Sequence, residues 1–111
     1  MGTDSEMPGA ASVSPAGLAA YQEGAVVSRT LLKRAGGTIT LFAFDAGQGL
    51  SEHTAPFDAV AQILEGEAEI TIAGTPLTVA AGELVLMPAN QPHALSARTR
   101  FKMLLTMMRS V

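Results

Sequence analysis

The sequence predicts a single all-β domain of antiparallel strands, and three observations lead to that prediction. From Gly24 onward, short runs of apolar and β-branched residues are separated by Gly, Pro and Asn, which is typical of successive strands. Several of these runs alternate between apolar and polar residues, which is the period of a half-buried strand. No long stretch has helical spacing, whereas parallel strands need crossovers of a dozen or more residues. Many short strands in 111 residues therefore favour a barrel or a sandwich.

The strands are predicted in order from the punctuation between them. In the clearest example, Ala68, Ile70 and Ile72 share one face, Gly74 lies in the turn that follows, and Gly82 interrupts the next strand. The predicted strands are Ala25–Lys33, Thr38–Asp45, Leu50–Ala55, Asp58–Leu64, Ala68–Ile72, Thr75–Val79, Glu83–Met87, Pro92–Ala97 and Phe101–Met108.

The first part of the chain differs in composition from the rest. Residues 1–20 are rich in Gly, Ala, Ser and Pro and hold few large apolar side chains, so packing offsets little of the entropy lost on ordering. We therefore expect residues 1–23 to form a flexible leader, with at most one short helical turn at 17–21, and residues 24–111 to form the barrel domain.

Composition excludes several classes of function. The absence of Cys removes disulfides, thiolate metal sites and a Cys nucleophile. Seven basic and ten acidic residues give a net charge of −3, which argues against a nucleic-acid partner. No apolar run reaches the length of a membrane helix, so we expect no membrane partner. The chain does not open with a secretory signal, and we expect a cytoplasmic protein.

Two spaced motifs hold most of the information about the family. Gly47, His53 and Gly66 form the first motif, and Gly82, Pro88 and His93 form the second. In spacing these residues resemble the two motifs of the cupin family, over residues 47–97. The resemblance is to small single-domain cupins of the RmlC-like type. It implies an antiparallel double-stranded β-helix, the jelly-roll barrel, in which both motifs line one end.

The resemblance also implies a metal site, and the chain departs from it. The four ligand positions of metal-binding cupins correspond to His53, Ala55, Ala59 and His93, so only two imidazoles remain to hold an ion. The implied cofactor is therefore either none or a weakly bound divalent metal such as Fe, Mn, Ni or Zn. Other candidate donors are Gln62, Asp58, Glu52 and Gln48. Strand parity directs the first three of them outward, and Gln48 lies in a loop.

Asn90 and Ala97 are further departures from the second motif. Asn90 stands where the family has a glycine, and Asn is one of the few residues that tolerate the left-handed region. Ala97 replaces the Asn that closes the motif. The change at Asn90 is conservative for the backbone, whereas the change at Ala97 is a further way in which the familiar site is incomplete.

Three functions from different classes agree with these residues. The favoured one is a barrel that binds a small organic ligand in a pocket lined by His53, His93, Met87, Ala55 and Ala59. The second is a metal-dependent enzyme of oxygenase or isomerase type with an incomplete two-His site. The third is a structural or regulatory dimer whose edge segments 25–28 and 104–108 pair across a two-fold axis. We expect a homodimer in each case. No residues are assigned a catalytic role, and whether the chain is an enzyme stays open.

Overall fold

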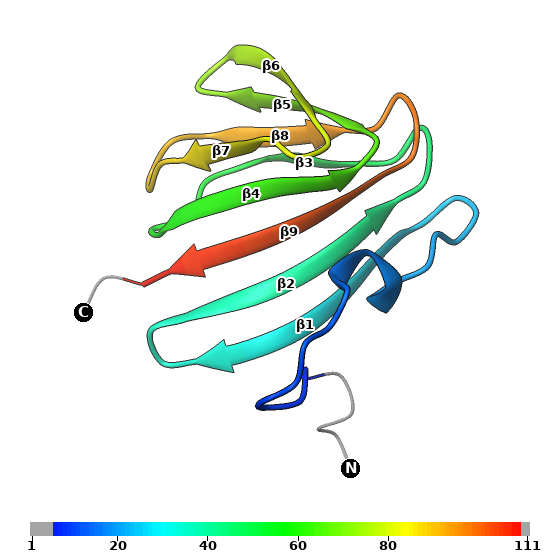
Figure 1. Ribbon diagram of the computed structural model, residues 1–111. Coiled ribbons are helices and arrows are strands. Elements are labelled where there is room, and N and C mark those ends of the chain that lie inside the picture. Colours follow the sequence, from blue (N-terminus) through cyan, green and yellow to red (C-terminus); the bar gives the residue numbers. More distant parts are fainter. Residues whose placement is uncertain (1–5, 110–111) are drawn as a thin grey trace.

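The computed structural model describes residues 6–109, which form two antiparallel sheets packed face to face (Figure 1). The first sheet has the strand order β1-β2-β9-β4-β7, and the second has the order β3-β8-β5-β6. The described elements are η1 (Pro15–Leu18), β1 (Val26–Arg34), β2 (Gly37–Phe44), β3 (Gly49–His53), β4 (Asp58–Glu65), β5 (Glu67–Ile72), β6 (Thr75–Ala80), β7 (Leu84–Met87), β8 (His93–Ser96) and β9 (Phe101–Met108).

The predicted all-β jelly roll is confirmed, strand by strand. Each predicted strand is present, and no predicted end lies more than two residues from the observed one. Gly66 of the first motif and Gly82 of the second both have a positive φ, of 76° and 89°. Asn90 has a φ of 64°, in the left-handed region that its replacement of a glycine requires.

The main core lies between the two sheets. Its largest fully buried side chains include Phe44, Phe101, Ile63, Ile70 and Met103. The rings of Phe44 and Phe101 stack with their centroids 4.4 Å apart. Because these residues come from β2, β4, β5 and β9, the core joins the middle of both sheets rather than one hairpin.

Strand parity separates the two faces of the first sheet. On β4, Ala59, Ala61 and Ile63 are buried in the core between the sheets. Gln62 alternates with them and Asp58 is exposed, so the prediction that these two point away from the interior is correct.

The N-terminal strap, residues 6–23, lies against the outer face of the first sheet. It includes η1, and its Ala19 forms a second buried cluster with Leu31, Leu41 and Ala43. The Met7 amide donates to the Leu31 carbonyl of the edge strand β1 (2.8 Å). Residues 6–23 were expected to form a flexible leader, but they pack against the sheet, which supplies the apolar surface that the segment itself lacks. Residues 1–5 lie outside the described part.

Polar contacts fasten the same strap to the centre of the sheet. The Tyr21 hydroxyl donates to Glu65 Oε2 (3.0 Å), and Lys102 Nζ donates to the Ala16 carbonyl (2.6 Å). Burial, with the hydrogen bond and negative charge of Glu65, raises the pKa of Tyr21 to about 12. The hydroxyl therefore stays protonated and able to donate throughout the physiological pH range.

The strand pairing overturns one expectation about the dimer. Segment 104–108 belongs to β9, which is hydrogen-bonded to β2 on one side and to β4 on the other. It therefore has no open edge with which to pair across a two-fold axis. Within residues 6–109, no helix has the length and hydropathy needed to cross a membrane.

Candidate functional site

Two strand ends of the second sheet bring both histidines of the chain together. β3 ends at His53 and β8 begins at His93, and the two residues are direct partners in the antiparallel ladder. The register shifts between Leu50 and His53, so a local irregularity sets the position of the first ring. The Asn90 amide donates to the Ala55 carbonyl (2.8 Å). This hydrogen bond links the loop that follows His53 to the loop that precedes His93.

The hydrogen bonds of the two rings determine their tautomers. His53 Nδ1 lies 2.8 Å from the Ser51 carbonyl oxygen, and His93 Nδ1 lies 3.2 Å from that of Gln91. A carbonyl oxygen only accepts, so each Nδ1 must carry the proton and donate it. In a neutral ring the other nitrogen, Nε2, is then a bare acceptor. The two Nε2 atoms are 3.1 Å apart, so two acceptors converge on one point.

The two rings differ in exposure, and this sets the electrostatics of the pair. His93 is 7% exposed, whereas His53 is exposed. Burial lowers the pKa of His93, and the charge of His53 lowers it further, against the opposing effect of the Gln91 carbonyl. Protonating His93 is therefore unfavourable, and near neutral pH its Nε2 remains an acceptor.

This depressed pKa predicts a pH dependence of stability. An unfolded histidine titrates near about 6.5, so below that pH the unfolded chain takes up a proton more readily than the folded chain. We expect the free energy of unfolding to fall as the pH drops from about 6.5 through the lower folded pKa of His93, and to stay level just above this window. Urea unfolding at a series of pH values measures it, with His93→Gln as the variant that loses this component. Stability that rises on acidification through the window would contradict the assignment.

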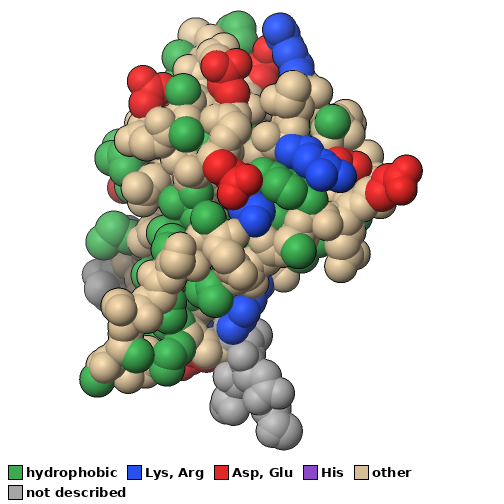
Figure 2. All heavy atoms as spheres, turned by 45° about the vertical axis from the view of Figure 1, so that its right-hand side comes forward, with side chains coloured by type: hydrophobic (Ala, Val, Ile, Leu, Met, Phe, Trp, Pro, Cys, Tyr) green, Lys and Arg blue, Asp and Glu red, His purple; other side chains and the backbone are tan. Residues whose placement is uncertain are grey.

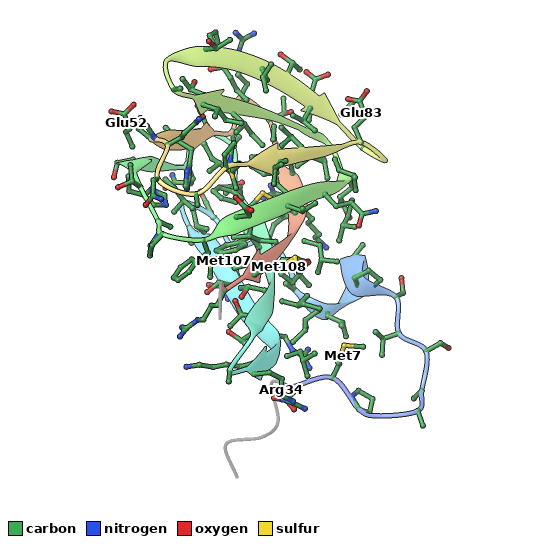
Figure 3. All side chains as sticks on the ribbon, turned by 90° about the vertical axis from the view of Figure 1, so that its left-hand side faces the viewer. Met7, Arg34, Glu52, Glu83, Met107 and Met108 are labelled. Carbon is green, nitrogen blue, oxygen red and sulfur yellow. The ribbon has the colours of Figure 1, made fainter. Side chains whose placement is uncertain are left out.

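The facing sheet supplies small and flexible side chains at the same end of the barrel. Cross-strand pairs place Thr38, Met107, Ala59 and Met87 in one row across β2, β9, β4 and β7. Ala59 and Met87 are buried, and Met107 packs partly buried against the same core. Figure 3 looks toward this end, with Met107 and Met108 labelled near its centre. Of the predicted pocket residues, Ala55 lies in the loop after β3 and is half-buried.

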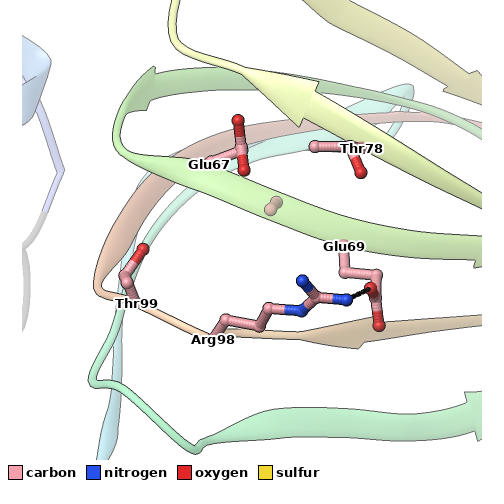
Figure 4. A pocket seen from close by; sticks show the side chains of 6 residues that line it. Glu67, Glu69, Thr78, Arg98 and Thr99 are labelled. Atoms are coloured by element: carbon pink, nitrogen blue, oxygen red, sulfur yellow. Dashed lines mark hydrogen bonds and ion pairs between the residues drawn. The ribbon is translucent and has the colours of Figure 1, made fainter.

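Two hollows lie away from the imidazole pair. One, of about 130 Å³, is lined by Glu67, Glu69, Thr78, Arg98 and Thr99 with Ala68, and is bordered by the Arg98–Glu69 ion pair at 3.2 Å (Figure 4). The other, of about 240 Å³, lies beside the β1–β2 hairpin. The five predicted pocket residues line neither of these two hollows.

The imidazole pair fits a divalent cation in geometry but not in number of donors. The two Nε2 atoms are 3.1 Å apart. An ion held about 2.0–2.1 Å from each of them would have an N–ion–N angle of about 95–100°, between the octahedral and the tetrahedral value. Within residues 6–109, however, no cluster of three or more His, Asp or Glu side chains is placed to hold a metal. Two protein donors fall short of the three that a catalytic metal usually has. The residues therefore do not fit a tightly held catalytic ion.

Comparison with protein families decides the assignment. Residues 40–108 match the family model described as a cupin domain, and this span includes both histidines and both glycine turns. The chain belongs to the cupin family. The match agrees with the small jelly-roll barrel that the two motifs predicted.

Solved structures similar to this cupin come from several bacteria. A conserved protein of unknown function from Streptococcus pyogenes is 37% identical, with a TM-score of 0.89 and coverage of 95% of this chain and 92% of that one. A cupin superfamily protein from Desulfitobacterium hafniense is 30% identical, with a TM-score of 0.87 and coverage of 94% and 95%. A cupin 2 conserved barrel domain protein from Leptotrichia buccalis is 38% identical, with a TM-score of 0.82, but this chain covers only 46% of it. A comparison with curated proteins finds no significant match.

Sequence reasoning missed two features of this site in the cupin. One is the pair of backbone carbonyls, of Ser51 and Gln91, that select the tautomers. The other is Thr38, whose hydroxyl is buried without a hydrogen-bond partner in the described protein. Its position in an alternating strand signalled an inward side chain, but only the register shows that its row reaches Ala59 and Met87.

Proposed function

We propose that this cupin binds a small organic ligand at the mouth of its barrel, through a donor group that the two imidazoles accept. The single observation behind the proposal is the convergence of two Nε2 acceptors 3.1 Å apart. Two facing lone pairs repel each other unless a proton, an N–H or O–H group or a cation lies between them. An ammonium group of a ligand, or two neighbouring hydroxyl groups, can donate to both Nε2 atoms.

The surroundings of the pair support a ligand with an apolar part. Ala59 and Met87 are cross-strand partners in one row of the facing sheet, and Ala55 lies two residues after His53 in the chain. Alanine adds little volume at positions 55 and 59, and methionine adapts to varied shapes. The ligand class that matches is therefore a compact alcohol, polyol or amine that carries a hydrocarbon portion.

A thermal-shift screen with matched variants tests this proposal. We expect at least one member of a panel of polyols, sugars, amino alcohols and hydroxy acids to raise the melting temperature of the protein, because a ligand that binds only the folded state stabilises it. The shift should disappear in His53→Ala and in His93→Gln. It should remain in Gln91→Ala, which removes an exposed neighbouring side chain but keeps the carbonyl that orients His93. A panel without effect, or a shift that survives in both histidine variants, would rule the proposal out.

A metal-dependent activity is the second candidate. The observation that favours it is the 3.1 Å separation of the two Nε2 atoms, which is short enough for one ion to contact both. Two imidazoles without a third protein donor hold an ion weakly, so exchangeable ligands would have to complete its coordination. Elemental analysis of protein purified without chelator separates the candidates. Less than about a tenth of an equivalent of Fe, Mn, Ni, Cu or Zn argues against a resident metal.

A further inference from the structure

Arg109, which follows β9, differs from most basic residues of the chain in having no carboxylate partner among residues 6–109. Figure 2, in which no histidine is visible, shows several Lys and Arg side chains beside acidic ones. Four of the seven basic side chains form ion pairs with carboxylates: Arg34 with Glu6, Arg98 with Glu69, Arg100 with Asp45 and Lys102 with Glu65.

The backbone places Arg109 at the mouth of the barrel. Its amide donates to the Gly36 carbonyl (2.9 Å), which continues the β2–β9 ladder one residue beyond Met108. Successive side chains of a strand point to opposite faces, so Arg109 shares a face with Met107. Met107 packs against the core between the sheets, and Figure 3 looks onto this end of β9. The Arg109 side chain therefore leaves the first sheet on the side that faces the imidazole pair.

The ring of Phe57 holds the guanidinium group near the histidines. Arg109 Cζ lies over this ring, 5.4 Å from its centroid. Phe57 is half-buried and comes four residues after His53, so the Cα atoms of these two residues are at most about 14 Å apart. The cation–π contact uses the positive charge of the guanidinium but gives its N–H donors no oxygen acceptor. Arg109 is thus positioned with its donors available.

The charges around the mouth favour an anion beside Arg109. Asp58 accepts from the Ala89 amide (2.9 Å) and does not pair with the arginine. Glu52 lies on β3, and Figure 3 shows its carboxylate at the periphery of the molecule, away from Met107. Lys33 lies in the cross-strand row of Met107, so it adds a second positive charge at this end of the sheet.

We propose that the ligand of this cupin carries a carboxylate, which Arg109 binds, while an ammonium group or two neighbouring hydroxyls of the same ligand donate to the imidazole pair. This inference rests on the proposed function, because it names the other end of the ligand that His53 and His93 hold. A guanidinium donates two parallel hydrogen bonds to a carboxylate. Packed sheets lie about 10 Å apart, so a compact molecule reaches from one to the other. Small amino acids and dihydroxy acids have this combination of groups.

Matched pairs of an acid and its alcohol test the carboxylate directly. Leucine with leucinol, threonine with threoninol, and glycerate with glycerol each differ by the exchange of a carboxylate for a hydroxymethyl group. We expect isothermal titration to show roughly 10- to 100-fold tighter binding of the acid in at least one pair, the range for a hydrogen bond between charged groups.

Variants of two arginines assign that preference to its residue. Arg109→Gln should bring the affinity for the acid close to that for the alcohol and leave the affinity for the alcohol unchanged. Arg34→Gln is the control, because Arg34 is an exposed arginine of the same sheet that pairs with Glu6, and it should keep the full preference. Phe57→Leu should reduce the preference only in part, since it removes the ring that positions Arg109 and not the charge itself.

The outcomes separate this inference from the proposed function. Acids that bind no better than their alcohols, or a preference that survives in Arg109→Gln, would overturn the carboxylate assignment, and alcohols that still bind through the histidines would leave the proposed function standing. A preference lost equally in Arg34→Gln would also overturn the assignment. If neither member of any pair binds, the inference and the proposed function fail together.

Discussion

Replacing Phe101 by Ala is expected to lower the free energy of unfolding by about 3–5 kcal/mol. Phe101 is fully buried, and its ring stacks on Phe44 at 4.4 Å where the two sheets meet. The truncation leaves a cavity that neither sheet can close, because both are held by their hydrogen-bonded ladders. Since domains of this size have only about 5–15 kcal/mol of stability, we expect the variant to be close to unfolding at 25 °C. Urea denaturation followed by circular dichroism measures the loss.

Phe42 offers the matched control for this change. Its ring lies on the same face of β2 as that of Phe44, 6.0 Å from it, but Phe42 is only half-buried. The substitution Phe42→Ala removes the same atoms from a site that solvent already reaches, so we expect a clearly smaller loss. Equal losses at Phe42 and Phe101 would mean that the stacked pair is not the centre of the core.

Gly66→Ala is expected to destabilise the protein by about 2–4 kcal/mol, the second large effect of a single substitution. Gly66 has a φ of 76°, and a Cβ atom there would meet the Arg100 carbonyl oxygen and Phe101. Those atoms belong to the backbone and the start of a buried side chain, so they cannot move aside easily. The loss is measured by the same urea denaturation.

Gly82→Ala separates the two costs that Gly66→Ala combines. Gly82 also has a positive φ, of 89°, but a Cβ atom would find nothing within 4 Å. It should therefore show only the conformational cost of about 1–2 kcal/mol. An equal loss of unfolding free energy at Gly82 and Gly66 would show that the close approach of Arg100 and Phe101 to Gly66 adds nothing to the cost of the substitution.

The strands could be predicted from the sequence because alternation and punctuation agree at most of their ends. The last strand was predicted to the residue, since Phe101 begins an apolar run that ends at Met108. The predicted end of the third strand at Ala55 was two residues too late. There the Ala55 carbonyl accepts from the Asn90 amide of a loop instead of from a strand, and such a tertiary contact has no local sequence signal.

The candidate site could be predicted only in part. Motif spacing identified His53 and His93, but the ring tautomers depend on where the Ser51 and Gln91 carbonyls point. The strap was missed for a related reason. Its own composition is poor in large apolar residues, and the surface that buries Ala19 comes from strand residues between Leu31 and Leu104, 12 to 85 residues away along the chain. Composition describes the apolar surface of a segment itself, and not the apolar surface that the rest of the fold places against it.

The strap has a mechanical consequence for the edge of the sheet. Through Met7 it is hydrogen-bonded to β1, and through Tyr21 to Glu65 of β4, so it bridges the outermost strand and an inner one across two others. An edge strand ordinarily frays first, because one side of it has no neighbour. Here the peripheral hairpin cannot peel away without also releasing the bridge, so its amide protons should exchange with solvent together with those of the strap, as one cooperative unit.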